Sequence, residues 1–84
     1  MKNRLIETIY PYEKNAKKHP RKQVQQVADS IREFGFNQPI VVDKQGIIIV
    51  GHGRFEAAKL LGLEEVPVLE VELSKEKANA YRDI

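Results

Sequence analysis

The residues best able to do chemistry lie in one short segment, Gly51-His52-Gly53-Arg54. It follows the apolar run Ile47–Val50 and precedes a helix that we expect from about Arg54 to Leu61. A strand that turns directly into a helix exposes backbone N–H groups at the positive end of the helix dipole, which favours phosphate binding. The two glycines permit either a close approach of a ligand to the backbone or a positive φ.

Two side chains of this segment could act on a bound anion. Arg54 can direct two N–H groups at phosphate oxygens. His52 can donate to a phosphate or carry a proton near neutral pH. From these residues alone, an ordinary tight turn is an alternative interpretation. The segment is no Walker A loop, because G-x-x-x-x-G-K-[ST] is missing, and the dinucleotide motif G-x-G-x-x-G is incomplete.

The rest of the sequence predicts a small α+β domain that positions this turn. A helix from about Arg21 to Phe34 has its apolar residues on one face, which places Phe34 in the core, and Gly35 ends it. We expect strands at Leu5–Ile9, Pro39–Val42, Ile47–Val50 and Val66–Leu73, and a last helix from Ser74. The continuous apolar runs of the two middle strands are typical of strands buried on both faces.

The composition narrows the classes of protein. The chain has 84 residues, which predicts a single domain over residues 1–84. It has no cysteine, which excludes disulfides, Cys-ligated metal sites and thiol nucleophiles, and its two histidines are far apart, so we expect no metal site. The longest apolar run is Ile47–Val50, and the first residues, Met1–Arg4, lack the apolar stretch typical of a signal peptide. We therefore expect a cytoplasmic location and no membrane partner.

The charges are distributed unevenly. Residues 1–22 hold seven basic and two acidic residues, whereas residues 63–84 hold three basic and six acidic ones. A polyanion is therefore expected on the N-terminal side, although a solvated loop is the alternative. The last predicted helix reaches Ile84 without a stop signal, so we expect the domain to precede a longer chain.

Together these segments resemble the ParB N-terminal domain of the ParB/sulfiredoxin-like superfamily. The resemblance runs from Asn15 to about Tyr81 and is carried by Ser30–Val42, Gly51–Gly62 and Val66–Val68. The chain looks most like ParB-like domains fused ahead of phage and prophage DNA-modification methyltransferases. The resemblance implies a mixed sheet of about four strands with about three helices.

The resemblance also implies a nucleoside triphosphate site, for CTP or ATP with Mg²⁺. In partitioning ParB proteins the corresponding turn reads G-E-R-R and holds the triphosphate of CTP. Gly51 and Arg54 match its first and last residues, whereas His52 and Gly53 replace the Glu and Arg between them. Because of these replacements, the resemblance implies a triphosphate site but neither CTP selectivity nor hydrolysis.

Three further positions match the pocket of the family. Gln38 belongs to the G-x-x-Q-P segment that shapes the nucleotide pocket. Asn15 and Lys17 stand where the partitioning proteins have N-P-R, so the resemblance implies that Lys17 replaces a phosphate-facing Arg.

Other branches of the superfamily are enzymes. Sulfiredoxins have a catalytic Cys at the position of His52, and a chain without cysteine cannot reduce a sulfinic acid in that way. The free-serine kinases have G-H-T-R in this turn, which is closer to the present sequence. They also need a carboxylate base, and the sequence assigns none of Glu7, Glu13 and Glu33 to that role.

Three functions therefore stand as hypotheses. The first is a nucleotide-binding module of a DNA-associated protein such as a DNA methyltransferase or a partition factor. The second is an enzyme domain (a kinase, NTPase or nuclease) with His52 as the catalytic candidate. The third is a domain that binds DNA through its basic N-terminal segment, without nucleotide. In the first case DNA would be bound by the attached domain or by that segment, and a homodimer is one oligomeric state to expect.

Overall fold

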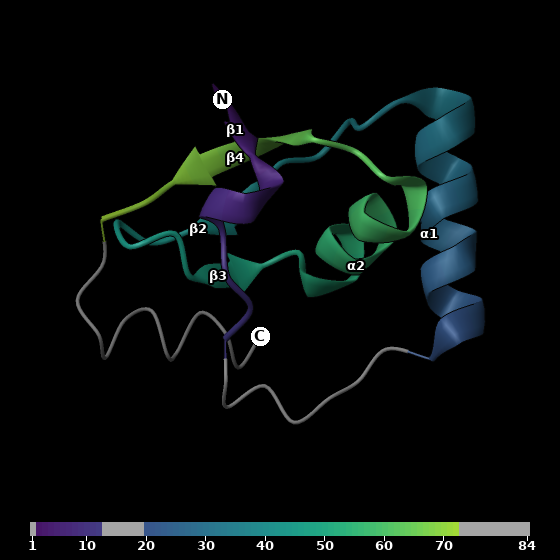
Figure 1. Ribbon diagram of the computed structural model, residues 1–84, viewed down its shortest axis with the longest axis horizontal. Coiled ribbons are helices and arrows are strands. Elements are labelled where there is room, and N and C mark those ends of the chain that lie inside the picture. Colours follow the sequence, from purple (N-terminus) through teal and green to yellow (C-terminus); the bar gives the residue numbers. More distant parts are fainter. Residues whose placement is uncertain (1, 13–19, 73–84) are drawn as a thin grey trace.

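The apolar runs of the sequence form a mixed sheet of four strands. In the computed structural model, which describes residues 2–12 and 20–72, the strands are β1 (Lys2–Leu5), β2 (Ile40–Val42), β3 (Ile48–Val50) and β4 (Glu65–Glu70). Their order across the sheet is β1-β4-β2-β3 (Figure 1). β2 and β4 run parallel, and the other two neighbouring pairs are antiparallel. The predicted α+β class and mixed sheet are confirmed.

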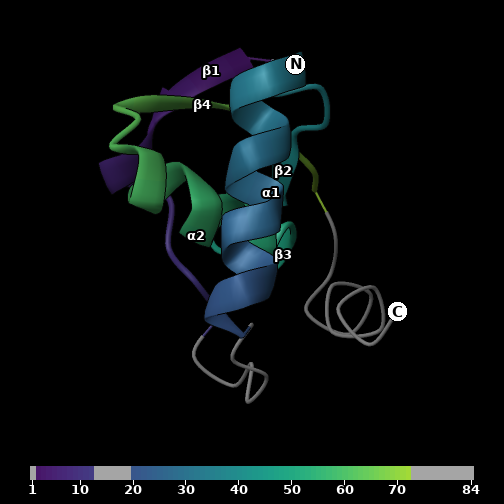
Figure 2. The same cartoon turned by 90° about the vertical axis from the view of Figure 1, so that its right-hand side faces the viewer.

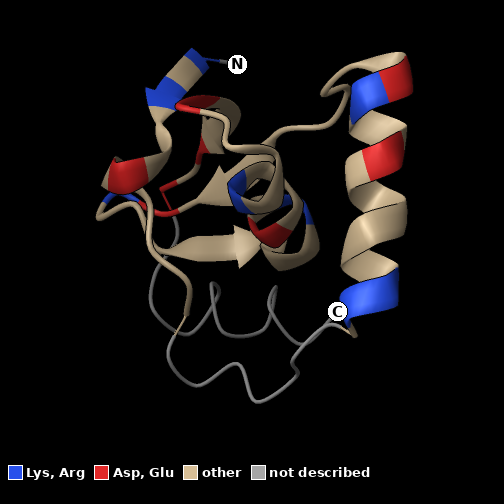
Figure 3. Ribbon diagram, turned by 45° about the vertical axis from the view of Figure 1, so that its right-hand side comes forward, with Lys and Arg blue, Asp and Glu red and all other residues tan. Residues whose placement is uncertain are grey.

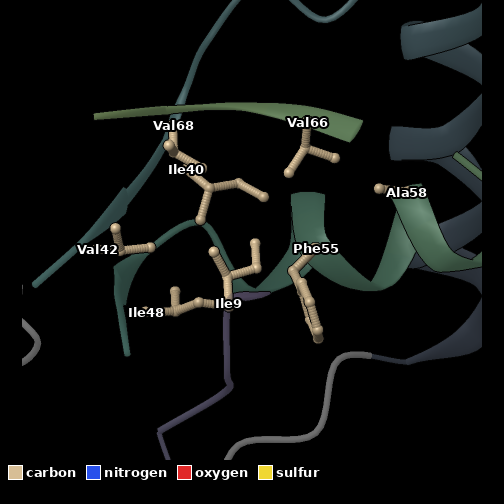
Figure 4. Close-up of a cluster of buried hydrophobic side chains, with 8 residues drawn as sticks. All are labelled: Ile9, Ile40, Val42, Ile48, Phe55, Ala58, Val66 and Val68. Carbon is tan, nitrogen blue, oxygen red and sulfur yellow. The ribbon is translucent and has the colours of Figure 1, made fainter. Parts of the chain in front are cut away.

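The core lies between this sheet and the helix α2 (His52–Leu61). Its members are Ile9 and apolar side chains from β2, β3, β4 and α2 (Figure 4): Ile40, Val42, Ile48, Phe55, Ala58, Val66 and Val68. All three residues of β2 are buried, and Val41 packs with Ile49 on the opposite face of the sheet. The expectation that β2 is buried on both faces is thus confirmed.

The long helix α1 (Arg21–Phe34) has the predicted bounds but covers α2, not the sheet. Figures 1 and 2 show it standing beside α2 at one end of the molecule. Only Ala28 of α1 is fully buried, and Phe34 is 66% exposed. The prediction that Phe34 belongs to the core is wrong, because the end of α1 that carries it extends beyond α2 in Figure 1.

This correction has a measurable consequence. Phe34→Ser is expected to change the free energy of unfolding by less than about 0.5 kcal/mol, since little apolar area is removed from contact. Urea unfolding followed by circular dichroism measures it. A loss above about 1.5 kcal/mol would instead show that the Phe34 ring is buried in solution.

The N-terminal strand also differs from the prediction. The strand predicted over Leu5–Ile9 lies instead at Lys2–Leu5, so only Leu5 is shared, and Ile6–Thr8 forms a 3₁₀ turn, η1. Polar contacts stabilise this turn: the Thr8 hydroxyl donates to the carbonyl of Leu5 at 2.6 Å, and the Arg4 guanidinium donates to the carbonyl of Thr8 at 2.9 Å. The turn brings Ile9 into the core, where it is only 3% exposed.

Other boundaries shift by a few residues. β4 ends at Glu70 and not at Leu73, and α2 begins at His52, two residues before the predicted start. The third helix, predicted from Ser74, lies outside the described residues. Within the part of the chain that the structure describes, no helix is long and apolar enough to span a membrane.

Candidate functional site

The turn between β3 and α2 has the geometry expected of an anion site. Gly51 adopts a left-handed conformation (φ 109°, ψ 25°) and is the N-cap of α2, and its carbonyl accepts the first helical bond from Phe55 N–H at 2.9 Å. The helix therefore supplies no acceptor for the N–H groups of His52, Gly53 and Arg54. Of the two glycines, Gly51 has the positive φ that the sequence allowed, whereas Gly53 lies inside the helix without one.

Gly51 also leaves little room for a side chain. A Cβ at this position would lie 3.2 Å from Arg54 Nη2 and 3.3 Å from Ile40 Cα. The guanidinium of Arg54 therefore packs directly against the Gly51 backbone, between the turn and the start of β2.

Gly51→Ala is expected to weaken anion binding and to lower the free energy of unfolding by about 1–3 kcal/mol, from left-handed backbone strain and the two tight contacts. Urea unfolding and phosphate-ligand titration measure the two effects. Gly62→Ala is the matched control, because Gly62 is also left-handed (φ 71°, ψ 28°) but a Cβ there would meet nothing within 4 Å. Equal losses of stability in both variants would show that the close approach at Gly51 is unimportant.

Arg54 is half-buried and is held by two neutral acceptors. Its Nη1 donates to Gln38 Oε1 at 3.3 Å and its Nη2 donates to the carbonyl of Pro39 at 3.1 Å. Its Nε is buried and has no acceptor among the described residues. Burial lowers the pKa of Arg54 below its ordinary value, but an arginine keeps its charge at neutral pH.

The charge of Arg54 has no counter-ion in the described part of the chain. The ion pairs found there join Arg4 to Glu70 and Lys44 to Glu72, both away from the turn. A partly desolvated cation thus lies beside the positive end of α2. This arrangement attracts an anion, because both partial charges have the same sign and neither is neutralised.

His52 connects the turn to the N-terminal segment. The backbone N–H of Tyr12 donates to His52 Nε2 at 3.2 Å. In this arrangement Nε2 is the unprotonated ring nitrogen, and Nδ1 carries the proton. Two residues earlier, Tyr10 pairs with Ile47 in a parallel bridge, so the segment that leads into residues 13–19 runs along β3 and ends beside the turn.

The structure thus brings together most of the predicted site. Gly51, His52, Gly53, Arg54 and Gln38 lie in one neighbourhood, whereas Asn15 and Lys17 lie outside the described residues. Sequence reasoning missed the carbonyl of Pro39 and the N–H of Tyr12, because backbone groups have no signature in residue type.

The donors at the turn fit an anion and not a metal ion. They are N–H groups of the backbone and of a guanidinium, none of which can coordinate a cation. Among residues 2–12 and 20–72, no group of three His, Cys, Asp or Glu side chains could hold a metal ion. A triphosphate fits this donor set, and any Mg²⁺ would be held chiefly by phosphate oxygens.

Comparison with known sequences defines the family. The profile of the ParB N-terminal domain matches residues 5–82, and the chain belongs to this family. The ParB-like nuclease domain-containing protein YnaK of Escherichia coli (strain K12) is 42% identical over 66 residues, covering 79% of this chain and 76% of that protein. The probable chromosome-partitioning protein ParB of Rickettsia prowazekii is 40% identical over 65 residues, covering 76% of this chain and 23% of that protein.

Solved structures agree with the family. A C-terminally truncated chromosome-partitioning ParB from Caulobacter crescentus, complexed with CTP-gamma-S, superposes with a TM-score of 0.83 at 26% identity and covers 96% of this chain and 49% of that one. The same partitioning protein complexed to the centromeric parS site gives 0.76 at 26% identity, covering 90% and 43%. Sulfiredoxin from Arabidopsis thaliana gives 0.78 at 24% identity, covering 94% and 92%, which shows the shared ParB/sulfiredoxin fold. The chain spans about half of the partitioning structure and about a quarter of the Rickettsia protein.

Proposed function

We propose that this domain is a nucleotide-binding module that captures the phosphates of CTP or ATP at the Gly51–Arg54 turn. One observation carries the proposal: the half-buried charge of Arg54 has no acidic partner among the described residues and lies beside the N-terminus of α2. A triphosphate would supply the missing negative charge.

Each residue of the turn would make a different contribution to phosphate binding. Each terminal nitrogen of Arg54 has a second hydrogen that can reach a phosphate oxygen while the first stays on Gln38 or Pro39. The N–H groups of His52 and Gly53 would donate to the same group, and the lack of a side chain at Gly51 leaves the backbone accessible.

Two segments would complete the pocket. Gln38 lies at its rim, in contact with Arg54. Asn15 and Lys17, which correspond to the family's N-P-R, would approach from the segment that follows Tyr12. Tyr12 itself is bonded to His52, so this segment leaves the described structure beside the turn.

The comparisons support a nucleotide as the ligand. The partitioning ParB from Caulobacter crescentus, which shares the fold at 26% identity, was solved with CTP-gamma-S. We therefore put CTP first among the nucleotides to test, with ATP next and Mg²⁺ as the accompanying ion. His52 is retained only as the candidate for a catalytic residue, should the nucleotide be hydrolysed.

We further propose that the whole protein acts on DNA, as a partition factor or as a DNA methyltransferase preceded by this domain. The parS complex of the partitioning protein and the ParB names of the curated relatives support a DNA-associated role. DNA would be bound by an attached domain or by the basic N-terminal segment, with residues 1–84 forming one domain. A homodimer is the oligomeric state to test first.

Calorimetric titration of the domain with CTP, ATP and GTP in Mg²⁺ tests the nucleotide proposal. We expect saturable binding of one nucleotide. Its affinity should depend little on which monovalent salt is present. If none of the three binds, the proposal fails. Duplex DNA titrated over a range of salt concentrations then tests the DNA-binding alternative, which predicts an affinity that falls steeply with salt.

A further inference from the structure

The chain that reaches the turn from the N-terminus is held along the edge of β3. β3 is the last strand of the sheet, and the segment after η1 lies beside it (Figure 1). Tyr10 N–H donates to the carbonyl of Gly46 at 2.8 Å, and Ile48 N–H donates to the carbonyl of Tyr10 at 2.9 Å. Ile9, one residue earlier, is buried in the core. Backbone pairing therefore fixes this chain as far as Tyr10.

Beyond Tyr10 the contact passes from the sheet to α2. Pro11 has no N–H and so cannot continue the backbone pairing. The next N–H, that of Tyr12, donates to His52 Nε2 at 3.2 Å. His52 is the first residue of α2 and directly follows Gly51, so its ring joins this chain to the turn that we assign to phosphate.

The bond to Tyr12 limits what the His52 ring can do. An imidazole nitrogen that accepts a hydrogen bond uses its one lone pair, so Nε2 cannot take up a proton while this bond lasts. Nδ1 carries the proton in this state, so it cannot act as a base either. The geometry therefore favours a ring that holds another group over a ring that transfers protons.

We propose that His52 is a positioning residue, which ties the chain at Tyr12 to the phosphate-binding turn through Nε2. The proposal rests on the proposed function, because it takes the turn as the phosphate site. It adds a role for the His52 ring that acts through Tyr12 and not on the reacting atoms. The chain that continues from Tyr12 leads to Asn15 and Lys17, the residues expected to approach the phosphates, so this tie would fix where their approach begins.

Two substitutions of His52 test the ring. His52→Leu removes the acceptor, and the affinity for inorganic tripolyphosphate is expected to fall roughly three- to tenfold, the factor that one ordinary hydrogen bond supplies. His52→Gln retains a side-chain acceptor for Tyr12 N–H but cannot carry a proton at neutral pH, and it is expected to recover most of the affinity. A ring that served only to carry protons would leave the affinity of both variants unchanged. Tripolyphosphate has no base or sugar, so its binding reports on the phosphate site alone.

Tyr12 allows the same bond to be tested from the donor side. Tyr12→Pro removes the backbone N–H, whereas the matched control Tyr12→Ala shortens the side chain and keeps the N–H. The affinity of Tyr12→Pro is expected to lie roughly three- to tenfold below that of Tyr12→Ala. In the His52→Leu background the bond is already absent, so the difference between proline and alanine at this position should nearly vanish.

The experiment is calorimetric titration of wild type and these variants with tripolyphosphate, together with hydrogen exchange of the Tyr12 amide measured by NMR in the unliganded proteins. Weaker binding by His52→Leu and Tyr12→Pro, recovery in His52→Gln, and a Tyr12 amide that exchanges faster in His52→Leu than in wild type support the tie. The tie is overturned, while the proposed function stands, if His52→Leu binds as wild type does, if His52→Gln binds as weakly as His52→Leu, or if Tyr12→Pro binds as well as Tyr12→Ala. Equal exchange of the Tyr12 amide in wild type and His52→Leu overturns it as well. If wild type does not bind the probe, the proposed function fails, and the positioning role fails with it.

Discussion

Replacing Arg54 with alanine is expected to weaken nucleotide binding at least tenfold while leaving the domain folded. A hydrogen bond from a charged donor contributes about 1.5–3 kcal/mol, which corresponds to roughly ten- to a hundredfold in affinity. Arg54 contributes its charge as well, which no acidic side chain among the described residues neutralises. Calorimetric titration of the nucleotide that binds wild type measures the loss.

Two further variants make this result specific. Arg32→Ala removes a positive charge from an exposed position of α1, a helix whose charged residues are coloured in Figure 3, and is expected to leave the affinity unchanged. Arg54→Lys keeps the charge but loses the planar fork, so an intermediate affinity is expected. Thermal unfolding of each variant shows that the fold is retained. Wild-type affinity in Arg54→Ala would remove the turn from consideration as the phosphate site.

Gly46→Ala is expected to lower the free energy of unfolding by about 2–5 kcal/mol. Gly46 has a φ of 84°, and a Cβ there would lie only 2.6 Å from the carbonyl oxygen of Thr8. The two backbones cannot separate easily, because Tyr10 N–H donates to the carbonyl of Gly46 at 2.8 Å. Left-handed strain and overpacking each contribute about 1–3 kcal/mol, and here they act together.

Gly62→Ala separates the two causes. Gly62 has a similar φ of 71°, but a Cβ there would have no neighbour within 4 Å. Only the strain of the left-handed backbone acts there, so the free energy of unfolding is expected to fall by about 1 kcal/mol. Urea unfolding curves of the two variants give the comparison. Equal losses of stability in the two variants would mean that the turn between β2 and β3 moves away from Thr8 at little cost. Such a result would contradict the packing seen in the structure.

Local signals in the sequence predict much of this fold. The apolar spacing of α1 and its terminal Gly35 give both ends of that helix, and the β-branched runs locate β2 and β3 to within one residue. The prediction fails where side chains act on the backbone. The Arg4 and Thr8 contacts end β1 at Leu5, and nothing in the apolar pattern marks them.

Periodicity also cannot predict how far a partner element extends. It places Phe34 on the inner face of α1, but this residue, the last of the helix, is 66% exposed. The only way to foresee this would be to know the relative position of the two helices, which depends on the packing of the whole domain.

In the candidate site, too, the sequence predicts the residues but not the contacts that depend on the whole fold. Residue types and spacing single out Gly51 and Arg54, and the structure places them in contact. The Pro39 carbonyl and the Tyr12 N–H are backbone groups, and the bond between Tyr12 and His52 spans 40 residues of sequence. Such long-range backbone contacts follow from the fold, so only the structure reveals that Arg54 is held before any ligand arrives.

The most direct test of a phosphate site at this turn is a titration of the ¹⁵N-labelled domain with CTP and Mg²⁺, followed by NMR. We predict saturable shifts centred on the backbone amides of His52, Gly53 and Arg54, the three N–H groups for which α2 supplies no acceptor. Saturable shifts confined to α1 or to β1, or no shift of these three amides at saturating CTP, would contradict the assignment.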